Sequence, residues 1–471
     1  MTGGVLMELW KLWCHIVLQL RPAFPRFRTF LWFTVAVCGF CTRTDLFGVS
    51  SFVRCLGLEK NSYNRLLSMF HCSGIDFCVL RRFWVKCVLF IAPGFLWEVN
   101  GRIVLLADGV KNPKSGHKMP GVKKLHQESE SNTKPEYIFG HNLQAVGIVL
   151  RCGIGLTALL LGAEIHDGLV FSNRCTKTLL DKMLGLIDSL GITIPAYYVL
   201  DAYYGAEKMI SGALRKGAHL ITRVRSNAVA YLDPDDAIRK KGRGRRRKYG
   251  EKIKLNSIFN MVDGWTEAEC MIYGSRTKVS FMAREMFWRQ AGRKVLFVFA
   301  RMCNGKKAIL LSTDTSLAPL DVIELYSARF RIEVGFKVAI RIIGALGYHF
   351  WMKDMKPIGR EGKNQYLHRE SEDYRQAVRR KVAVYHNFMQ CGIIAQGTMT
   401  LLSVMKPDLC WKYFGSWMRT MKTDMPPSEW VVSHSLRNTL SEFLADPPEN
   451  AKWVNFLNSK REKGCEEAKA A

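Results

Sequence analysis

The chain has 471 residues, which is enough for about three domains of ordinary size. Hydrophobic residues make up 48% and charged residues 23%, a balance that excludes a chain disordered throughout its length. Lys and Arg number 69 against 41 Asp and Glu, which gives a formal net charge of +28. This excess is unusual for an enzyme of small metabolites. It indicates a polyanionic partner, either nucleic acid or an anionic membrane surface.

The membrane alternative depends on an apolar segment near the start of the chain. Its longest uncharged stretch, 29–42, has fourteen residues, whereas a membrane-spanning helix needs about 20. We therefore expect a buried core helix and no membrane partner. The segment also lacks the small-residue cleavage site of an export signal, so the expected location is the cytoplasm, in association with the nucleoid.

Fourteen cysteines are scattered along the chain without a repeating spacing. Cys38 and Cys41 have the spacing of a metal or redox pair, but no second pair completes a zinc site and both lie in the apolar stretch. Core packing in a reducing compartment is therefore the preferred interpretation of these cysteines.

Residues 1–98 are predicted to be helical. Apolar segments alternate with short amphipathic ones, Asn61 is placed as a helix N-cap, and Arg81, Arg82 and Lys86 are expected on one side of a third short helix. Two interpretations are open for this region. One is a helix-turn-helix-like unit that binds DNA or dimerises, and the other is a plain helical bundle that packs on the next domain.

The pattern changes to strands over residues 99–225. Apolar runs bounded by Gly or polar clusters, together with two helical segments closed by glycine, predict the order β-β-β-α-β-α-β. Hairpin strands followed by crossover helices are typical of an α/β domain with a mixed sheet.

The remaining residues divide into three further regions. Alternating segments after a basic run predict an antiparallel β insertion over 226–312, a helix of the core is expected within 313–351, and 352–471 is predicted to be a helical C-terminal region. The predicted fold class is therefore α/β, a mixed sheet with helices, interrupted by a β insertion and flanked by helical N- and C-terminal regions.

Two carboxylates follow apolar runs at positions that the predicted sheet brings together. Asp108 lies near the end of the first strand, in LLADGVK, and Asp201 at the end of the fourth, in YYVLDAYYG. These strands can lie side by side in parallel, so both side chains would emerge at one sheet edge. Two nearby carboxylates repel, and a hard divalent cation with oxygen ligands relieves that repulsion. The alternative for Asp108-Gly109 alone is a simple turn.

A third carboxylate lies on the helix after the insertion. Tyr326, Arg329 and Glu333 have the spacing i, i+3 and i+7, so they share one helical face, which Lys337 extends. The simplest interpretation of an isolated helix is a solvated face with an Arg329–Glu333 ion pair. Neighbouring apolar residues indicate that the face is partly buried.

This combination of motifs resembles the DDE transposases of bacterial insertion sequences. The resemblance rests on LLADGVK, YYVLDAYYG and the spacing Tyr-x-x-Arg-x-x-x-Glu that ends at Glu333, and it covers about residues 100–351. It implies an RNase H-like catalytic core with a β insertion domain between the second Asp and the Glu. It also implies that Asp108, Asp201 and Glu333 are the catalytic residues and hold two Mg²⁺ ions, with Mn²⁺ as a substitute.

The resemblance further implies a partner and the residues that contact it. The partner would be double-stranded DNA, as terminal inverted repeats of the element and as target DNA, bound by a homodimer. Predicted DNA-binding residues are Tyr326, Arg329, Lys337, Lys111, Lys114, Arg243, Arg245, Arg246, Arg247 and Lys248. For Trp265 and Trp288 in the insertion, core packing is preferred to stacking on a flipped base.

Two other classes of function stay open. One is an RNase H-like nuclease or resolvase that cuts DNA without joining strands. The other is a DNA-binding protein that is derived from a transposase and has lost catalysis.

The sequence departs from the family pattern beyond Glu333. The family has Lys seven residues after the Glu, and Ile340 stands there in this chain. At 100° per residue in an α-helix, Lys337 lies about 40° from Glu333 and Arg341 about 80°, so Lys337 is expected to take over the role.

The basic run leads to a first prediction. Residues 239–248 carry eight positive charges and no acid. Neutralising Arg243, Arg245, Arg246 and Arg247 together should weaken binding to all DNA sequences alike, because phosphate contacts carry no sequence information. The slope of log affinity against log salt should flatten by several units, at about 0.9 per lost phosphate contact. An unchanged slope would mean that the run is only a solvated loop.

Overall fold

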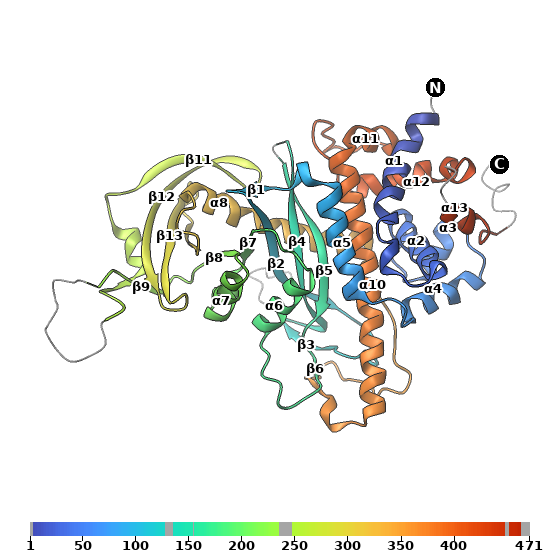
Figure 1. Ribbon diagram of the computed structural model, residues 1–471, viewed down its shortest axis with the longest axis horizontal. Coiled ribbons are helices and arrows are strands. Elements are labelled where there is room, and N and C mark those ends of the chain that lie inside the picture. Colours follow the sequence, from blue (N-terminus) through green and yellow to red (C-terminus); the bar gives the residue numbers. More distant parts are fainter. Residues whose placement is uncertain (1–2, 128–134, 154, 235–246, 448–451, 463–471) are drawn as a thin grey trace.

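The computed structural model describes residues 3–127, 135–153, 155–234, 247–447 and 452–462. In Figure 1 the strands of the insertion lie at one end, the N- and C-terminal helices at the other, and the core sheet between them. The central sheet of the described residues has 13 strands, in the order β10-β9-β12-β13-β14-β8-β7-β2-β4-β3, with β1, β11 and β5 paired to β2, β12 and β4.

The core of the fold has the predicted strand and helix order. Its elements are β1 (Glu98–Val99), β2 (Arg102–Pro113), β3 (Lys123–His126), β4 (Tyr137–Cys152), β5 (Gly155–Ile165), β6 (Leu169–Val170), α6 (Leu179–Ser189), β7 (Ala196–Leu200), α7 (Glu207–Arg215) and β8 (His219–Arg223). Strands β2, β7 and β8 are parallel, whereas β4 and β5 run antiparallel to their neighbours. Every residue of β7 is buried, as expected for a parallel strand covered on both faces. The mixed α/β fold of an RNase H-like core is thus confirmed.

The β insertion continues the core sheet. It comprises β9 (Val229–Tyr231), β10 (Lys252–Lys254), β11 (Thr266–Ile272), β12 (Ser275–Trp288), β13 (Arg293–Met302) and β14 (Lys307–Ser312). Strand β14 pairs with β8 over three residues, so the insertion continues the sheet beyond β8, on the side away from β7 and β2. Helix α8 (Pro319–Ala328) packs on β11, β14 and β8, and therefore spans the junction of insertion and core.

The helix of the third acid follows directly. Helix α9 (Phe330–Val338) packs on β5 and β2, and a π-helical turn η6 (Ala339–Ile343) extends it to Gly344 in the left-handed conformation. The predicted angle of about 80° between Glu333 and Arg341 is based on a continuous α-helix, and it is wrong because Arg341 lies in the π-helical turn. A π turn accommodates more residues per turn than an α-helix.

The N- and C-terminal regions form one helical assembly. It comprises α1 (Gly3–Leu18), α2 (Phe27–Thr42), α3 (Ser50–Leu56), α4 (Asn61–His71), α5 (Phe77–Ile91), α10 (Glu372–Met405), α11 (Pro407–Phe414), α12 (Glu429–Ala445) and α13 (Lys452–Asn458), with the short strand β15 (Gln365–Tyr366) before α10. Helix α10 contacts α1, α2, α4, α5 and α12, and it also packs on β5 (Figure 1). This arrangement favours the bundle interpretation over a separate helix-turn-helix unit.

Details of the N-terminal helices differ from the prediction in two places. Asn61 is the first residue of α4 and caps nothing with its side chain; Lys60 is at the N-cap position. Arg81 is fully buried, and its guanidinium bonds Glu164 and Ser189, both at 2.6 Å. It therefore joins α5 to the sheet instead of forming a basic edge. Cys38 and Cys41 are both fully buried in α2, as expected for core residues.

One described helix, α10, is long and apolar enough to cross a membrane by length and composition. Nearly all of its apolar window is buried inside the protein, the setting of a core helix. The segment 29–42 lies in α2, which is shorter and is buried along most of its length.

Three buried histidines predict how acid affects stability. Burial is the main cause that lowers the pKa of His141 to about 3 and those of His166 and His386 to about 4. Unfolded histidines titrate near 6.5, so between pH 6.5 and 4 the unfolded chain binds more protons and stability falls as pH falls. Each histidine contributes about 1.4 kcal/mol per pH unit over that window.

The measurement is urea unfolding at pH 7, 6, 5 and 4. His386→Gln should reduce the loss of stability between pH 6 and 4 by about 1.4 kcal/mol per unit, and His15→Gln, which changes an exposed histidine, should not. Equal pH dependence of the two variants would contradict the expectation.

Candidate active site

The first two predicted acids lie side by side at the same level of the sheet. Strands β2 and β7 pair in parallel with Ala107 opposite Leu200, so Asp108 and Asp201 are the next residues on each strand. Neighbouring strands are about 4.8 Å apart. Asp108 is not at a strand end, however, because β2 continues to Pro113 through its pairing with β4. Strand β7 does end, and Asp201 precedes the 3-10 turn η3 (Ala202–Tyr204).

The third acid is linked to the first through Arg329. The guanidinium of Arg329 contacts Asp108 Oδ2 through Nη1 at 2.7 Å and Glu333 Oε1 through Nη2 at 2.7 Å. The predicted Arg329–Glu333 ion pair is therefore present, and it is part of a three-member bridge. The side chains of Arg329 and Asp108 are each 19% exposed, so the bridge is largely shielded from water.

The electrostatics of Asp108 show that the three acids act on one another. Burial raises the pKa of Asp108 to about 6 against the lowering effects of Arg329 and of the Gly109 backbone N–H, which donates to Oδ1 at 2.7 Å. The negative charges of Asp201 and Glu333 raise it further. A cation among these carboxylates removes much of that penalty, since it favours their charged forms.

Tyr326 and Arg329 belong to the same cluster. Burial is the main cause that raises the pKa of Tyr326, with Asp201 adding to it and Arg329 and Arg223 opposing it. Burial would lower the pKa of the Arg329 guanidinium, but the surrounding acids, Asp108 first, raise it above its ordinary value. Arg329 is thus held as a cation between Asp108 and Glu333.

The donor chemistry of the site fits a hard divalent cation. Asp108, Asp201 and Glu333 offer carboxylate oxygens, the ligands that Mg²⁺ prefers. Within the described parts of the chain, no three His, Cys, Asp or Glu side chains stand close enough together to hold a metal ion as they are. The guanidinium of Arg329 lies between two of the three acids, Asp108 and Glu333.

The predicted DNA-binding lysines differ in how far they are buried. Lys337 on α9 and Arg341 in the π turn are both exposed. Lys111 is half-buried, and its Nζ donates to His126 O at 2.6 Å. Lys114 is only 8% exposed and donates to two backbone carbonyls, so its prediction as a DNA contact is wrong.

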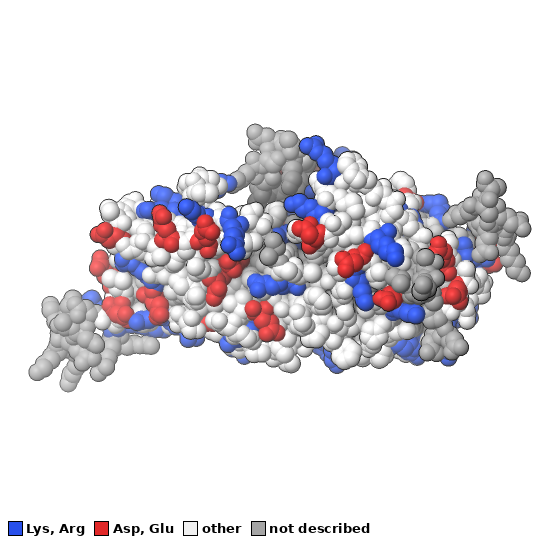
Figure 2. Space-filling view, turned by 90° about the horizontal axis from the view of Figure 1, so that it is seen from above, with Lys and Arg blue, Asp and Glu red and all other residues white. Residues whose placement is uncertain are grey.

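The basic run is only partly within the described residues. Arg243, Arg245 and Arg246 lie outside them, whereas Arg247 and Lys248 are exposed. Elsewhere, Lys and Arg are interspersed with Asp and Glu on the face drawn in Figure 2, so that face of the described residues carries no continuous basic stripe.

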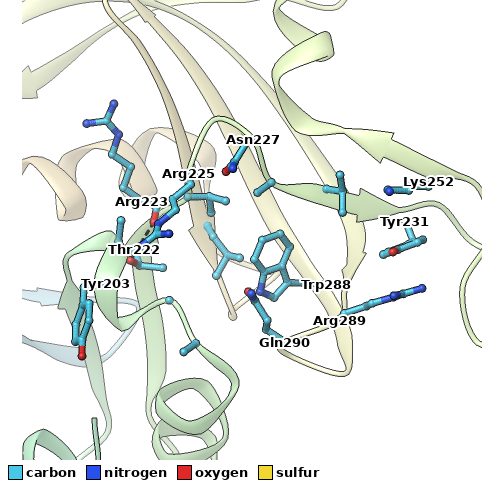
Figure 3. A pocket seen from close by; sticks show the side chains of 17 residues that line it. Tyr203, Thr222, Arg223, Arg225, Asn227, Tyr231, Lys252, Trp288, Arg289 and Gln290 are labelled. Atoms are coloured by element: carbon cyan, nitrogen blue, oxygen red, sulfur yellow. Dashed lines mark hydrogen bonds between the residues drawn. The ribbon is translucent and has the colours of Figure 1, made fainter. Parts of the chain in front are cut away.

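A cavity of about 550 Å³ opens beside Asp201, and sequence reasoning missed it. Its lining includes Arg223, Arg225, Lys252 and Arg289, and it includes no carboxylate. Figure 3 shows Tyr203 and the arginines of the β8 exit on one side, and Tyr231, Lys252 and Arg289 on the other. A signal existed in HLITRVRS, because β8 lies parallel to β7 and ends at the edge that carries Asp201.

The two tryptophans of the insertion differ in setting. Trp288 is 6% exposed, yet it lines the cavity between the two groups of side chains, and its indole N–H has no partner in the described structure (Figure 3). Trp265 packs on Phe259, its Nε1 donates to Met261 O, and the Arg301 guanidinium lies 3.6 Å from its ring centroid. Trp265 thus packs against the core, as predicted. Trp288 is a core residue that also lines the cavity.

A comparison with protein families agrees with this geometry. The sequence model of the family described as transposase DDE domain matches residues 107–345, which is just over half of the chain and includes all three acids. No curated protein sequence matches the chain.

The bridge formed by Arg329 can be tested by stability. Arg329→Met should destabilise the chain by about 2 kcal/mol at pH 8, below the 3–5 kcal/mol of a fully buried pair because Glu333 is 42% exposed. The loss should be smaller at pH 5, where Asp108 is protonated and repels Glu333 less. Chemical denaturation at both pH values measures it.

Lys337→Met is the matched control, since it removes an exposed cation from the same helix. It should change stability by no more than about 0.5 kcal/mol. Equal effects of the two substitutions would show that the bridge contributes nothing.

Proposed function

Because the chain belongs to the transposase DDE-domain family, we propose that it cleaves the ends of a mobile DNA element and joins them to target DNA. The observation that carries this proposal is the register of β2 and β7. That register sets Asp108 and Asp201 side by side, with Glu333 connected to Asp108 through Arg329.

The proposed chemistry is metal-dependent phosphoryl transfer. Two Mg²⁺ ions held by carboxylates would lower the pKa of an attacking water or 3′-hydroxyl and stabilise the leaving oxygen. The three acids would hold these ions, and no covalent bond between protein and DNA is needed. Mn²⁺ serves as an alternative ion.

Arg329 has a defined part in this reaction. Its planar guanidinium already contacts one oxygen of each of two carboxylates, and the same two nitrogens fit two oxygens of a phosphate. When DNA and metal neutralise the acids, Arg329 is released to hold the phosphate beside the scissile bond. Tyr326, which lies near both Arg329 and Asp201, orients the same phosphate.

The basic cavity supplies a path for the DNA strand. It begins at Ala202 and Tyr203, directly after Asp201, and continues between the core and the insertion. Its cations suit the phosphate backbone and its aromatic side chains suit bases, as in other sites for single strands. The partner is therefore double-stranded DNA whose strand is drawn from the active site toward the insertion, bound by a homodimer at the inverted repeats and at the target.

The central prediction concerns the three acids. Asp108→Ala, Asp201→Ala and Glu333→Ala should each abolish strand cleavage in Mg²⁺ and leave binding to element ends largely intact. Each change removes an expected metal ligand, whereas most of the affinity comes from cations on phosphates. Nicking of end-containing DNA and gel-shift titration in Ca²⁺ measure the two properties.

Asp188→Ala is the control, because it removes an exposed carboxylate that pairs with Lys216 away from the site. It should cleave like the wild-type chain. Substantial nicking by any of the three variants would remove that residue from the site. Cleavage without strand joining by the wild type would instead identify a nuclease or resolvase, and binding without cleavage would identify a DNA-binding protein derived from a transposase.

A further inference from the structure

Lys114 is a buried lysine without a carboxylate partner. Its side chain follows β2 directly, and the residue is 8% exposed. Its Nζ donates to Leu346 O at 2.6 Å and to Tyr348 O at 3.0 Å, and it lies 3.6 Å from the centroid of the Tyr348 ring. Lys114 forms no ion pair in the described structure, and burial lowers its pKa to about 7, so the amine is partly neutral near pH 7 but remains a hydrogen-bond donor.

The side chains around Lys114 are polar, and none of the described ones that it contacts is a carboxylate. His141 of β4 and His349 both experience its charge, and Tyr385 of α10 stacks on Tyr348 at 4.7 Å between centroids. A methionine would fill a similar volume without the cost of burying a charge. The amino group is therefore needed as the hydrogen-bond donor to the two carbonyls, which belong to residues that are almost completely buried.

These carbonyls lie just beyond the helix that carries the third acid. Helix α9 with Glu333 continues through the π turn to Gly344, and Leu346 and Tyr348 follow at once. Asn112, two residues before Lys114 on the same side of the extended chain, donates from Nδ2 to the same Leu346 O at 2.9 Å. Two side chains, one within β2 and one directly after it, thus bond the segment that follows the helix of Glu333.

We propose that Lys114 is a positioning residue that sets the distance between Asp108 and Glu333 by fixing the exit of α9 to β2. The effect of Lys114 on catalysis rests on the proposed function. Its effect on the position of α9 rests on the hydrogen bonds alone. The bridge formed by Arg329 joins the two acids directly but must open when substrate binds. Lys114 holds the same two elements together from a point outside the reacting groups, so it keeps their spacing while Arg329 is released.

The test compares Lys114→Met with Lys118→Met in the full chain. Lys118 lies in the same loop, and its Nζ also donates to a backbone carbonyl of a later segment, Lys353 O at 3.0 Å, but its side chain is exposed. The two variants therefore make the same substitution and remove the same kind of bond, and they differ in burial and in connection to α9.

Hydrogen–deuterium exchange is the first readout. Peptides that cover residues 333–348 should exchange faster in Lys114→Met than in the wild type, and those of β12 and β13 should not change. Lys118→Met should match the wild type in both regions. Unchanged exchange of 333–348 in Lys114→Met would overturn the proposal.

The second readout is the binding of Mn²⁺ in the absence of DNA, measured from the electron paramagnetic resonance signal of the free ion. Asp108→Ala should abolish Mn²⁺ binding. Lys114→Met should lower the Mn²⁺ affinity about tenfold, which is the lower end of the effect of residues that orient metal ligands. A lysine that only stabilised the fold would lower the melting temperature and leave Mn²⁺ affinity of the folded chain unchanged, and this result would also overturn the proposal.

A second variant covers the case in which Lys114→Met does not fold. Asn112→Ala removes one of the two donors to Leu346 O and should change exchange and Mn²⁺ affinity in the same direction by a smaller factor. Wild-type values for both would overturn the proposal. A wild-type chain that fails to cleave DNA would refute the proposed function separately, because the exchange experiment still decides the role of Lys114.

Discussion

The site depends on the repulsion among carboxylates that the sheet brings to one edge. Parallel pairing of β2 with β7 sets Asp108 beside Asp201, and α9 adds Glu333. Burial makes this repulsion costly, as the raised pKa of Asp108 shows. Arg329 supplies the compensating positive charge and bonds two of the acids at once. The arrangement is therefore stabilised by a cation of the chain itself, and the proposed function requires that a metal ion take its place when DNA binds.

The same edge explains how the insertion contributes to the site. Because β14 pairs with β8, the insertion is a continuation of the sheet, and β8 alone separates it from β7, the strand that Asp201 follows. The basic cavity forms at this junction, from the exit of β8 and from Trp288 and Arg289 near the end of β12. At the opposite side, α9 packs on β5 and β2, and α10 supports β5 from the helical assembly. Both ends of the molecule thus hold the position of the three acids.

Much of the core and the acids could be predicted from sequence because their signals are local. Buried strands read as apolar runs, and the positions of Asp108 and Asp201 within those runs followed from their neighbours. The errors have a common cause. Lys114 looked like one of several surface lysines, and Arg81 like part of a basic edge, because a side chain's burial depends on residues far along the chain: Leu346 and Tyr348 for Lys114, Glu164 and Ser189 for Arg81. The π turn after Val338 was missed because its sequence continues an ordinary helical pattern.

The sequence by itself determined which residue types could do the chemistry, the order of strands and helices around them, and the family to which they belong. Those properties follow from hydrophobic periodicity and from the spacing of a few polar residues. Only the tertiary structure decided that Arg329 bridges Asp108 and Glu333, that a basic cavity opens beside Asp201, and that Lys114 faces inward to hold the exit of α9. The physical reason is that each of these depends on contacts between residues 21 to 234 positions apart, for which local pattern carries no information. Only the Arg329–Glu333 half of the bridge is local, and its spacing did predict it.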